Sequence, residues 1–155
     1  MKIAEEYFQR LLGSGDALDA VTTLDQLWCA REGVSLDKHQ LGLSRPEYVV
    51  HLALMYDGEV GNGGHLQYFD NRGERSADTL EALRELQLDG RASTLERALR
   101  IFPNGVVPAD PSGKQLRDLG ELDRELYELS EDVDETCLRY IRAHEDEILI
   151  PERTP

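Results

Sequence analysis

Apolar residues recur at intervals of three and four along almost the whole chain, whereas runs that alternate apolar and polar residues are scarce. Spacing of this kind places apolar side chains on one face of an α-helix. The chain has 155 residues, which is enough to bury a core, and it has no Pro/Gly/Ser linker long enough to divide it. We therefore predict an all-α fold, with residues 1–155 forming a single compact multi-helix domain.

Local signals predict where the helices begin and end. Asp16 can cap one helix, and Ser44-Arg45-Pro46-Glu47 has the form of a capping box with proline in the first turn. A loop with one helical turn is expected over 33–44. The last helical region has candidate breaks at Gly120 and Ser130 and should end at Pro151. The expected helices cover about residues 3–12, 16–31, 45–61, 65–71 and 76–86, then a helix from Arg91 or Ser93 to Phe102, and finally residues 114–150.

The chain is strongly acidic, with 31 acidic and 17 basic residues and a net charge of −14. Direct nucleic-acid binding needs Lys and Arg to neutralise phosphates, so this charge argues against it and favours a basic protein partner. No apolar run is long enough to span a membrane. The N-terminus has no apolar signal region, which predicts a cytoplasmic protein. Cys29 and Cys137 are expected as buried free thiols of a reducing compartment, with a disulfide left open.

Six acids in the last third of the chain are spaced 3, 4, 3, 4, 3, beside an apolar stripe of the same period. On one continuous helix they would line the edge of its buried face and form a surface that binds a partner. Two alternatives stay open: a solvated face without a partner, or a new helix capped by Ser130 that cuts the stripe in two. The stripe consists of Asp118, Glu121, Glu125, Glu128, Asp132 and Glu135.

The most distinctive string of the chain is Glu-Val-Gly-Asn-Gly-Gly-His-Leu-Gln-Tyr-Phe-Asp-Asn at residues 59–71. Its Asn-Gly-Gly lies between two helical patterns, where glycine permits the positive φ of a tight corner. Four polar side chains of the string can form a hydrogen-bonded network that fixes this corner; alternatively, the string lines a small-ligand or enzymatic pocket. The residues concerned are Glu59, Asn62, Gly63, Gly64, His65, Gln67 and Asn71.

No enzymatic motif accompanies these residues. The histidines lack the His-x3-His or Glu-x-x-His spacing of zinc sites, and no phosphate-binding or nucleophile motif occurs. His51 is expected to be a packed or half-exposed histidine on an apolar helix face. We predict no catalytic residue, no metal and no cofactor; the alternative is a base or metal ligand at His65 in the pocket around Glu59, Asn62 and Gln67.

Residues 59–71 contain every element of the pattern Glu-Val-x-Asn-Gly-Gly-x-x-Gln-aromatic-aromatic-x-Asn. In this string, and in the helical patterns that follow, the chain resembles a bacterial family long regarded as of unknown function. The resemblance covers roughly residues 45–148, the family-like core, while residues 1–44 match less clearly. It implies an all-helical domain. The family includes an acidic, dimeric DNA mimic that occupies the DNA-binding face of a transcription repressor.

Charge and resemblance together predict a non-enzymatic acidic interaction protein. As a DNA mimic it would bind a basic DNA-binding or regulatory protein, such as a transcription regulator, through the stripe. One stripe imitates one strand sparsely, so a second acidic edge is needed, from the region of Asp57 and Glu59 or from the mate of a homodimer. The alternatives are the pocket described above and a structural or immunity-type binding partner without mimicry.

Overall fold

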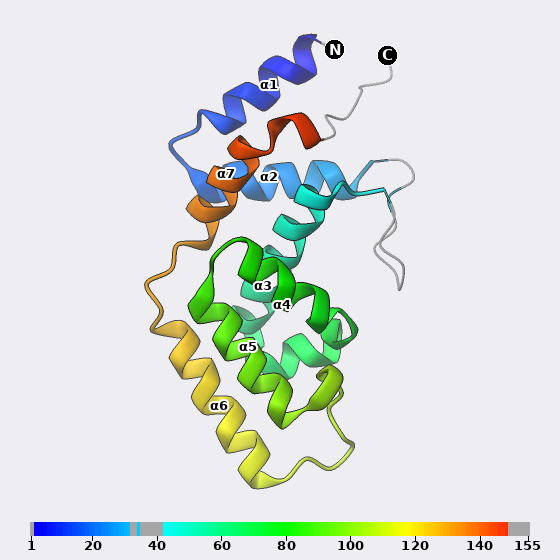
Figure 1. The fold of residues 1–155 in the computed structure, drawn as a ribbon, viewed down its shortest axis with the longest axis vertical. Coiled ribbons are helices and arrows are strands. Elements are labelled where there is room, and N and C mark those ends of the chain that lie inside the picture. Colours follow the sequence, from blue (N-terminus) through cyan, green and yellow to red (C-terminus); the bar gives the residue numbers. More distant parts are fainter. Residues whose placement is uncertain (1, 32–33, 35–41, 149–155) are drawn as a thin grey trace. The chain divides into compact units, whose positions relative to one another are not determined.

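The protein is described from a computed structural model, which covers residues 2–31, 34 and 42–148. Every regular element among these residues is helical, which confirms the all-α prediction (Figure 1). Short 3-10 turns occupy Gly73–Arg75, Pro103–Gly105 and Glu145–Glu147. The α-helices are α1 (Lys2–Leu12), α2 (Ala17–Cys29), α3 (Arg45–Arg72), α4 (Ser76–Glu85), α5 (Asp89–Ile101), α6 (Gly113–Tyr127) and α7 (Val133–Ala143).

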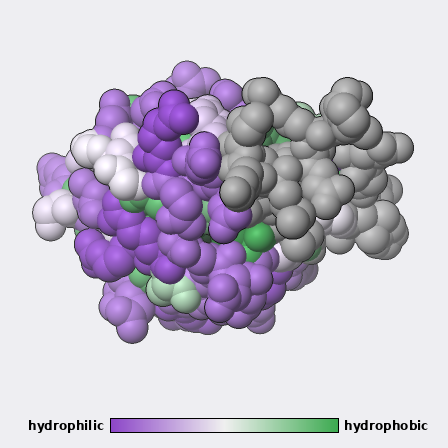
Figure 2. All heavy atoms as spheres, turned by 90° about the horizontal axis from the view of Figure 1, so that it is seen from above, coloured by the Kyte–Doolittle hydropathy of each residue, from purple (hydrophilic) through white to green (hydrophobic). Residues whose placement is uncertain are grey.

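The chain divides into two compact units. The terminal unit combines residues 1–51 with 134–155, and the central unit comprises Leu52–Val133. The single-domain organisation expected from the sequence stays a prediction. None of the helices in the described residues is long and apolar enough to cross a membrane. On the face drawn in Figure 2, hydrophilic residues predominate and hydrophobic ones form small separate areas.

The terminal unit buries the apolar faces that the helical period predicted. Phe8, Trp28 and Ile141 are buried and come from α1, α2 and α7. The Asp16 carboxylate accepts from the backbone N–H of Asp19, which confirms the predicted helix cap. Near the end of α7, Arg142 Nε donates to the carbonyl of Leu12, 2.7 Å away.

The predicted capping box at the start of α3 is present. The Glu47 carboxylate accepts from the Ser44 backbone N–H at 2.9 Å, and Ser44 Oγ accepts from the Glu47 backbone N–H at 3.4 Å. Glu47 is 0% exposed, and its carboxylate also receives two hydrogen bonds from Arg31 at 2.6 and 2.7 Å. A fully buried carboxylate needs such a cation. The local pattern predicted the cap, whereas this pairing with α2 depends on the fold.

The central unit forms around an aromatic core and contains the part of α3 from Leu52 onward together with α4, α5 and α6. Tyr68, Phe69 and Phe102 are buried, and the ring of Phe102 meets the edge of Phe69. Helix α6 lies beside α5 and buries the predicted apolar stripe at Leu119, Leu122 and Leu126 (Figure 1). The stripe of leucines thus faces the unit, and acids lie along its edges.

Of the two candidate breaks in the last third, the one at Ser130 is present and the one at Gly120 is absent. Gly120 lies inside α6 and does not break it, whereas the helix ends at Tyr127 and α7 begins only at Val133. Ser130 therefore does not cap a helix with residues 131 and 132 in its first turn. The physical reason lies in Glu131, whose carboxylate accepts the backbone N–H groups of Gly90 and Arg91 at the start of α5.

One further boundary differs from the prediction, and two others fall mostly or wholly outside the described residues. Helix α7 ends at Ala143, earlier than the expected end near residue 150. The loop expected over 33–44 and the end at Pro151 fall mostly or wholly outside the described residues.

Candidate functional site

The acidic stripe does not lie on one helix, which corrects the continuous surface considered from the sequence. Asp118, Glu121 and Glu125 belong to α6, and Glu128 is the residue that caps its C-terminus. Asp132 lies in the connection, and Glu135 lies on α7 in the terminal unit. The part of the stripe that one rigid element carries is therefore Asp118, Glu121, Glu125 and Glu128, which we call the α6 acidic row.

Internal cations neutralise two members of the α6 acidic row. Arg97 of α5 donates two hydrogen bonds to the Glu125 carboxylate, at 2.7 and 2.8 Å, and these lower the pKa of Glu125. Lys114 pairs with Asp118 one turn away. Glu121 and Glu128 are exposed and form no ion pair within the described residues. These two carboxylates are the row's uncompensated charges.

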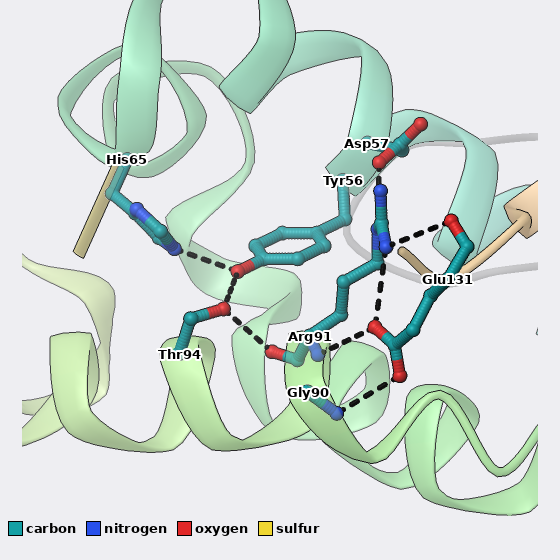
Figure 3. Close-up of polar contacts among 7 residues, drawn as sticks. All are labelled: Tyr56, Asp57, His65, Gly90, Arg91, Thr94 and Glu131. Atoms are coloured by element: carbon teal, nitrogen blue, oxygen red, sulfur yellow. Dashed lines mark hydrogen bonds and ion pairs between the residues drawn. The ribbon is translucent and has the colours of Figure 1, made fainter. Parts of the chain in front are cut away.

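Two further acids near the stripe stabilise the fold (Figure 3). The Arg91 guanidinium donates to Asp57 at 2.8 Å and to Glu131 at 3.1 Å. Burial opposes the charge of Arg91, but the hydrogen bonds and charges of these two acids outweigh it and raise its pKa. Glu131 thereby joins the segment after α6 to the N-terminus of α5, where an anion is favoured. The charge of Glu131 is therefore compensated by groups of the central unit itself.

The corner at Asn62-Gly63-Gly64 is a sharp kink within α3, as the glycines predicted. Gly64 has φ 74° and ψ −177°, a conformation open almost only to glycine. The kink turns the next residue, His65, inward, where its side chain is 0% exposed. Asp123 of α6 accepts from the His65 backbone N–H at 2.8 Å and from its Nδ1 at 2.6 Å. The corner is thus attached to α6 by a carboxylate.

A chain of hydrogen bonds continues from the other ring nitrogen of His65 (Figure 3). The Tyr56 hydroxyl lies 2.6 Å from His65 Nε2 and 3.0 Å from Thr94 Oγ1, and Thr94 donates to the Arg91 carbonyl at 2.9 Å. One tyrosine proton cannot serve both neighbours when Thr94 uses its own proton on Arg91. Tyr56 thus links His65 to Thr94 and to helix α5.

The predicted polar network at the corner is present, but His65 is not part of it. Gln67 Nε2 donates to Glu59 Oε2 at 2.7 Å, Asn71 Nδ2 donates to the same oxygen at 3.0 Å, and Asn62 Nδ2 donates to Gln67 Oε1 at 3.3 Å. The hydrogen bond from Gln67, with smaller contributions from Asn71 and Arg72, lowers the pKa of Glu59 against the effect of burial. We call these residues, Glu59, Asn62, Gln67 and Asn71, the corner network.

Replacing Gln67 with alanine should lower the free energy of unfolding by about 1–2 kcal/mol at pH 7, because a charged group loses its strongest donor. Since the folded pKa of Glu59 is depressed, its contribution is present above the unfolded pKa and is lost as pH falls through the folded value. The loss caused by Gln67→Ala should therefore shrink in acid. Urea unfolding at several pH values measures it, with exposed Gln26→Ala as the control. An unchanged loss at low pH would contradict this account.

The corner residues belong to two separate sets of hydrogen bonds. His65 is buried, and both of its ring nitrogens are engaged by Tyr56 and Asp123. The corner network joins Glu59, Gln67 and their carboxamide neighbours through separate hydrogen bonds. The sequence analysis missed Tyr56, Thr94 and Arg91. A sequence signal for these residues exists: each has a polar atom on an otherwise apolar helix face. Such an atom needs a hydrogen-bond partner when it is buried.

Comparison with known proteins gives one match. The family model described as "DMP19-like protein" matches residues 41–144, more than half of the chain. No curated protein and no solved structure matches the chain. The match includes α3 to α7 and thus the kink, the corner network and the α6 acidic row.

Proposed function

We propose, from the premise that this chain belongs to the family of DMP19-like proteins, that it is a non-enzymatic acidic protein which binds a basic DNA-binding protein in place of DNA. The α6 acidic row is the centre of the proposed surface. The observation that carries the proposal is the exposure of Glu121 and Glu128 without a compensating cation. A partner rich in Lys and Arg would supply the cations that the fold does not.

The charge of the central unit supports this proposal. Residues 52–133 hold 17 acidic and nine basic residues, an excess of eight. From Asp118 to Glu128 the α6 acidic row extends about 15 Å at ~1.5 Å per residue. A DNA strand presents one phosphate per ~3.4 Å of axis. The four carboxylates of this row, two of which are paired with cations within the chain, therefore imitate one DNA strand at a lower charge density.

Imitation of both DNA strands needs a second acidic edge. The carboxylates of Asp57 and Glu59 already have partners within the chain. Asp57 pairs with Arg91, and Glu59 accepts the donors of the corner network. Helix α4 carries another row of exposed acids with helical spacing, and both α4 and α6 pack against α5. We propose this α4 row, Asp78, Glu81 and Glu85, as the second edge, with Asp78 and Glu85 also interacting within the chain; the mate of a homodimer is the other source.

The experiment removes only the uncompensated charges. Glu121→Gln combined with Glu128→Gln should weaken binding to a basic partner about tenfold, since each exposed charge contributes up to about 1 kcal/mol. The partner is captured from host lysate on the immobilised chain at low salt and released at high salt, because screening weakens exposed pairs. The captured protein is then purified, and its Kd for each variant is measured.

A matched control keeps the net charge of the variant. Glu5→Gln combined with Glu6→Gln removes two exposed acids from α1 and should leave the Kd within about twofold. Competition with duplex DNA tests mimicry itself: DNA and the chain should exclude each other from the partner. Simultaneous binding of both, or equal Kd values for the two double variants, would refute the proposal.

A further inference from the structure

Three side chains that can ligate a metal ion meet in the terminal unit, whereas the residues of the proposed binding surface belong to the central unit. Asp25 and Cys29 lie one turn apart on α2, and His51 lies on α3. His51 Nδ1 is 2.8 Å from Asp25 Oδ1 and 3.6 Å from Cys29 Sγ. Cys29 Sγ is 3.9 Å from Asp25 Oδ1. Each residue therefore directs one ligand atom to the same small volume.

We propose that Asp25, Cys29 and His51 bind one divalent transition-metal ion of the Zn²⁺ type. This site is independent of the proposed DNA mimicry. Imidazole nitrogen, thiolate sulfur and carboxylate oxygen form a donor set that zinc accepts, and three protein ligands leave one coordination position for a non-protein ligand.

Two of the three separations between the ligand atoms are near those of a tetrahedral ion. Zinc lies about 2.0–2.3 Å from nitrogen, oxygen and sulfur ligands, so the ligand atoms of one tetrahedron are ~3.3–3.8 Å apart. The two distances from Cys29 Sγ, 3.6 and 3.9 Å, are near this range. Asp25 and His51 are at hydrogen-bond distance and need to separate by about 0.5 Å as metal ligands. A rotation of the two side chains provides a movement of this size.

Burial and charge also suit a cation. Asp25 is 8% exposed and His51 is 5% exposed, so a charge here has little water around it. Burial, followed by the charge of Asp25, raises the pKa of Cys29 to about 11, so the thiol keeps its proton without a cation. On binding, the Sγ–H proton passes to solvent, and His51 binds through the Nδ1 lone pair as a neutral imidazole with its hydrogen on Nε2. Thiolate and carboxylate then balance the two positive charges.

No metal was predicted from the sequence, because the histidines lack the His-x3-His and Glu-x-x-His spacings of local zinc motifs. Asp25 and Cys29 have the i, i+4 spacing of ligands on one helix face. The third ligand is 22 residues further along the chain from Cys29. Only the packing of α3 against α2 brings His51 to Asp25 and Cys29, so no local sequence motif predicts the site.

The test uses the full chain, freed of metal with a chelator and titrated with Co²⁺ as a spectroscopic substitute for Zn²⁺. We expect one ion per chain, the visible absorption of a tetrahedral Co²⁺ site and a thiolate-to-metal charge-transfer band, all removed by one equivalent of Zn²⁺. Cys29→Ser should abolish the charge-transfer band, and both Cys29→Ser and His51→Gln should weaken Zn²⁺ binding at least about tenfold.

Cys137→Ser is the matched control, because it removes the other cysteine, which is buried in α7. It should retain the charge-transfer band and the affinity of the wild type. The wild-type spectrum is informative even if a variant fails to fold. Absence of a thiolate band in the wild-type protein, or a band that disappears with Cys137 and persists without Cys29, would overturn the proposal.

Discussion

Replacing Gly64 with alanine should lower the free energy of unfolding by about 3–4 kcal/mol, a large part of the stability of a protein of this size. Gly64 has φ 74° and ψ −177°, a region that costs an L-residue about 1–3 kcal/mol. A Cβ at this position would also come within 2.9 Å of Asp123 Cγ. The carboxylate that holds His65 would have to move away from its two donors. Backbone strain and the loss of this contact therefore add to each other.

Gly61→Ala is the matched control, because it lies three residues earlier in the same helix. A Cβ at Gly61 meets nothing within 4 Å, and the position has no positive φ. Alanine there should be neutral or should stabilise the protein by about 0.5–1 kcal/mol, since it restricts the unfolded chain. Urea unfolding of both variants measures the difference. Similar stabilities of Gly64→Ala and Gly61→Ala would show that the corner does not need glycine.

His65→Ala is expected to lower the free energy of unfolding by about 3 kcal/mol. The imidazole is fully buried, so its removal leaves a cavity. It also leaves the Asp123 carboxylate and the Tyr56 hydroxyl without one of their partners in a buried environment. Burial holds the pKa of Tyr56 far above its usual value, so this hydroxyl cannot ionise to compensate. The cavity and the lost hydrogen bonds therefore both lower the free energy of unfolding of the variant.

A double-mutant cycle separates the polar term from the cavity. Asp123→Ala alone should also destabilise the protein, and the double variant with His65→Ala should cost less than the sum of the two single variants, by about 1–2 kcal/mol. Chemical denaturation of the four proteins gives this coupling energy. Additive losses would mean that His65 and Asp123 contribute independently, and that the histidine is buried for its volume alone.

The local sequence predicted several features of the fold correctly, because short-range physics determines them. The period of three and four in the apolar residues requires helices, and each helix buries the face that the period defines. Asp16 and the Ser44–Glu47 box cap helices because their side chains reach backbone groups only three residues away. Asn62-Gly63-Gly64 predicted the kink, since glycine alone tolerates the backbone there.

The acidic stripe shows where prediction from one sequence stops. Spacing alone placed six acids on one line, but Glu131 bonds to the start of α5 and the helix ends at Tyr127. The spacing also gave equal weight to acids that have different partners. Glu125 is paired with Arg97, whereas Glu121 is exposed without a cation in the described part of the chain. Such pairings join residues 28 or more positions apart, which no periodicity records.

The sequence by itself therefore determined the helical class, the kinked corner, the corner network and the excess of negative charge. These follow from backbone preference, burial of apolar faces and composition, which act within a few residues or on the chain as a whole. Only the tertiary structure decided which carboxylates remain free for a partner, that His65 faces the interior, and that Asp25, Cys29 and His51 meet. A side chain's electrostatic role depends on which distant groups lie within hydrogen-bond distance, and packing alone sets those neighbours.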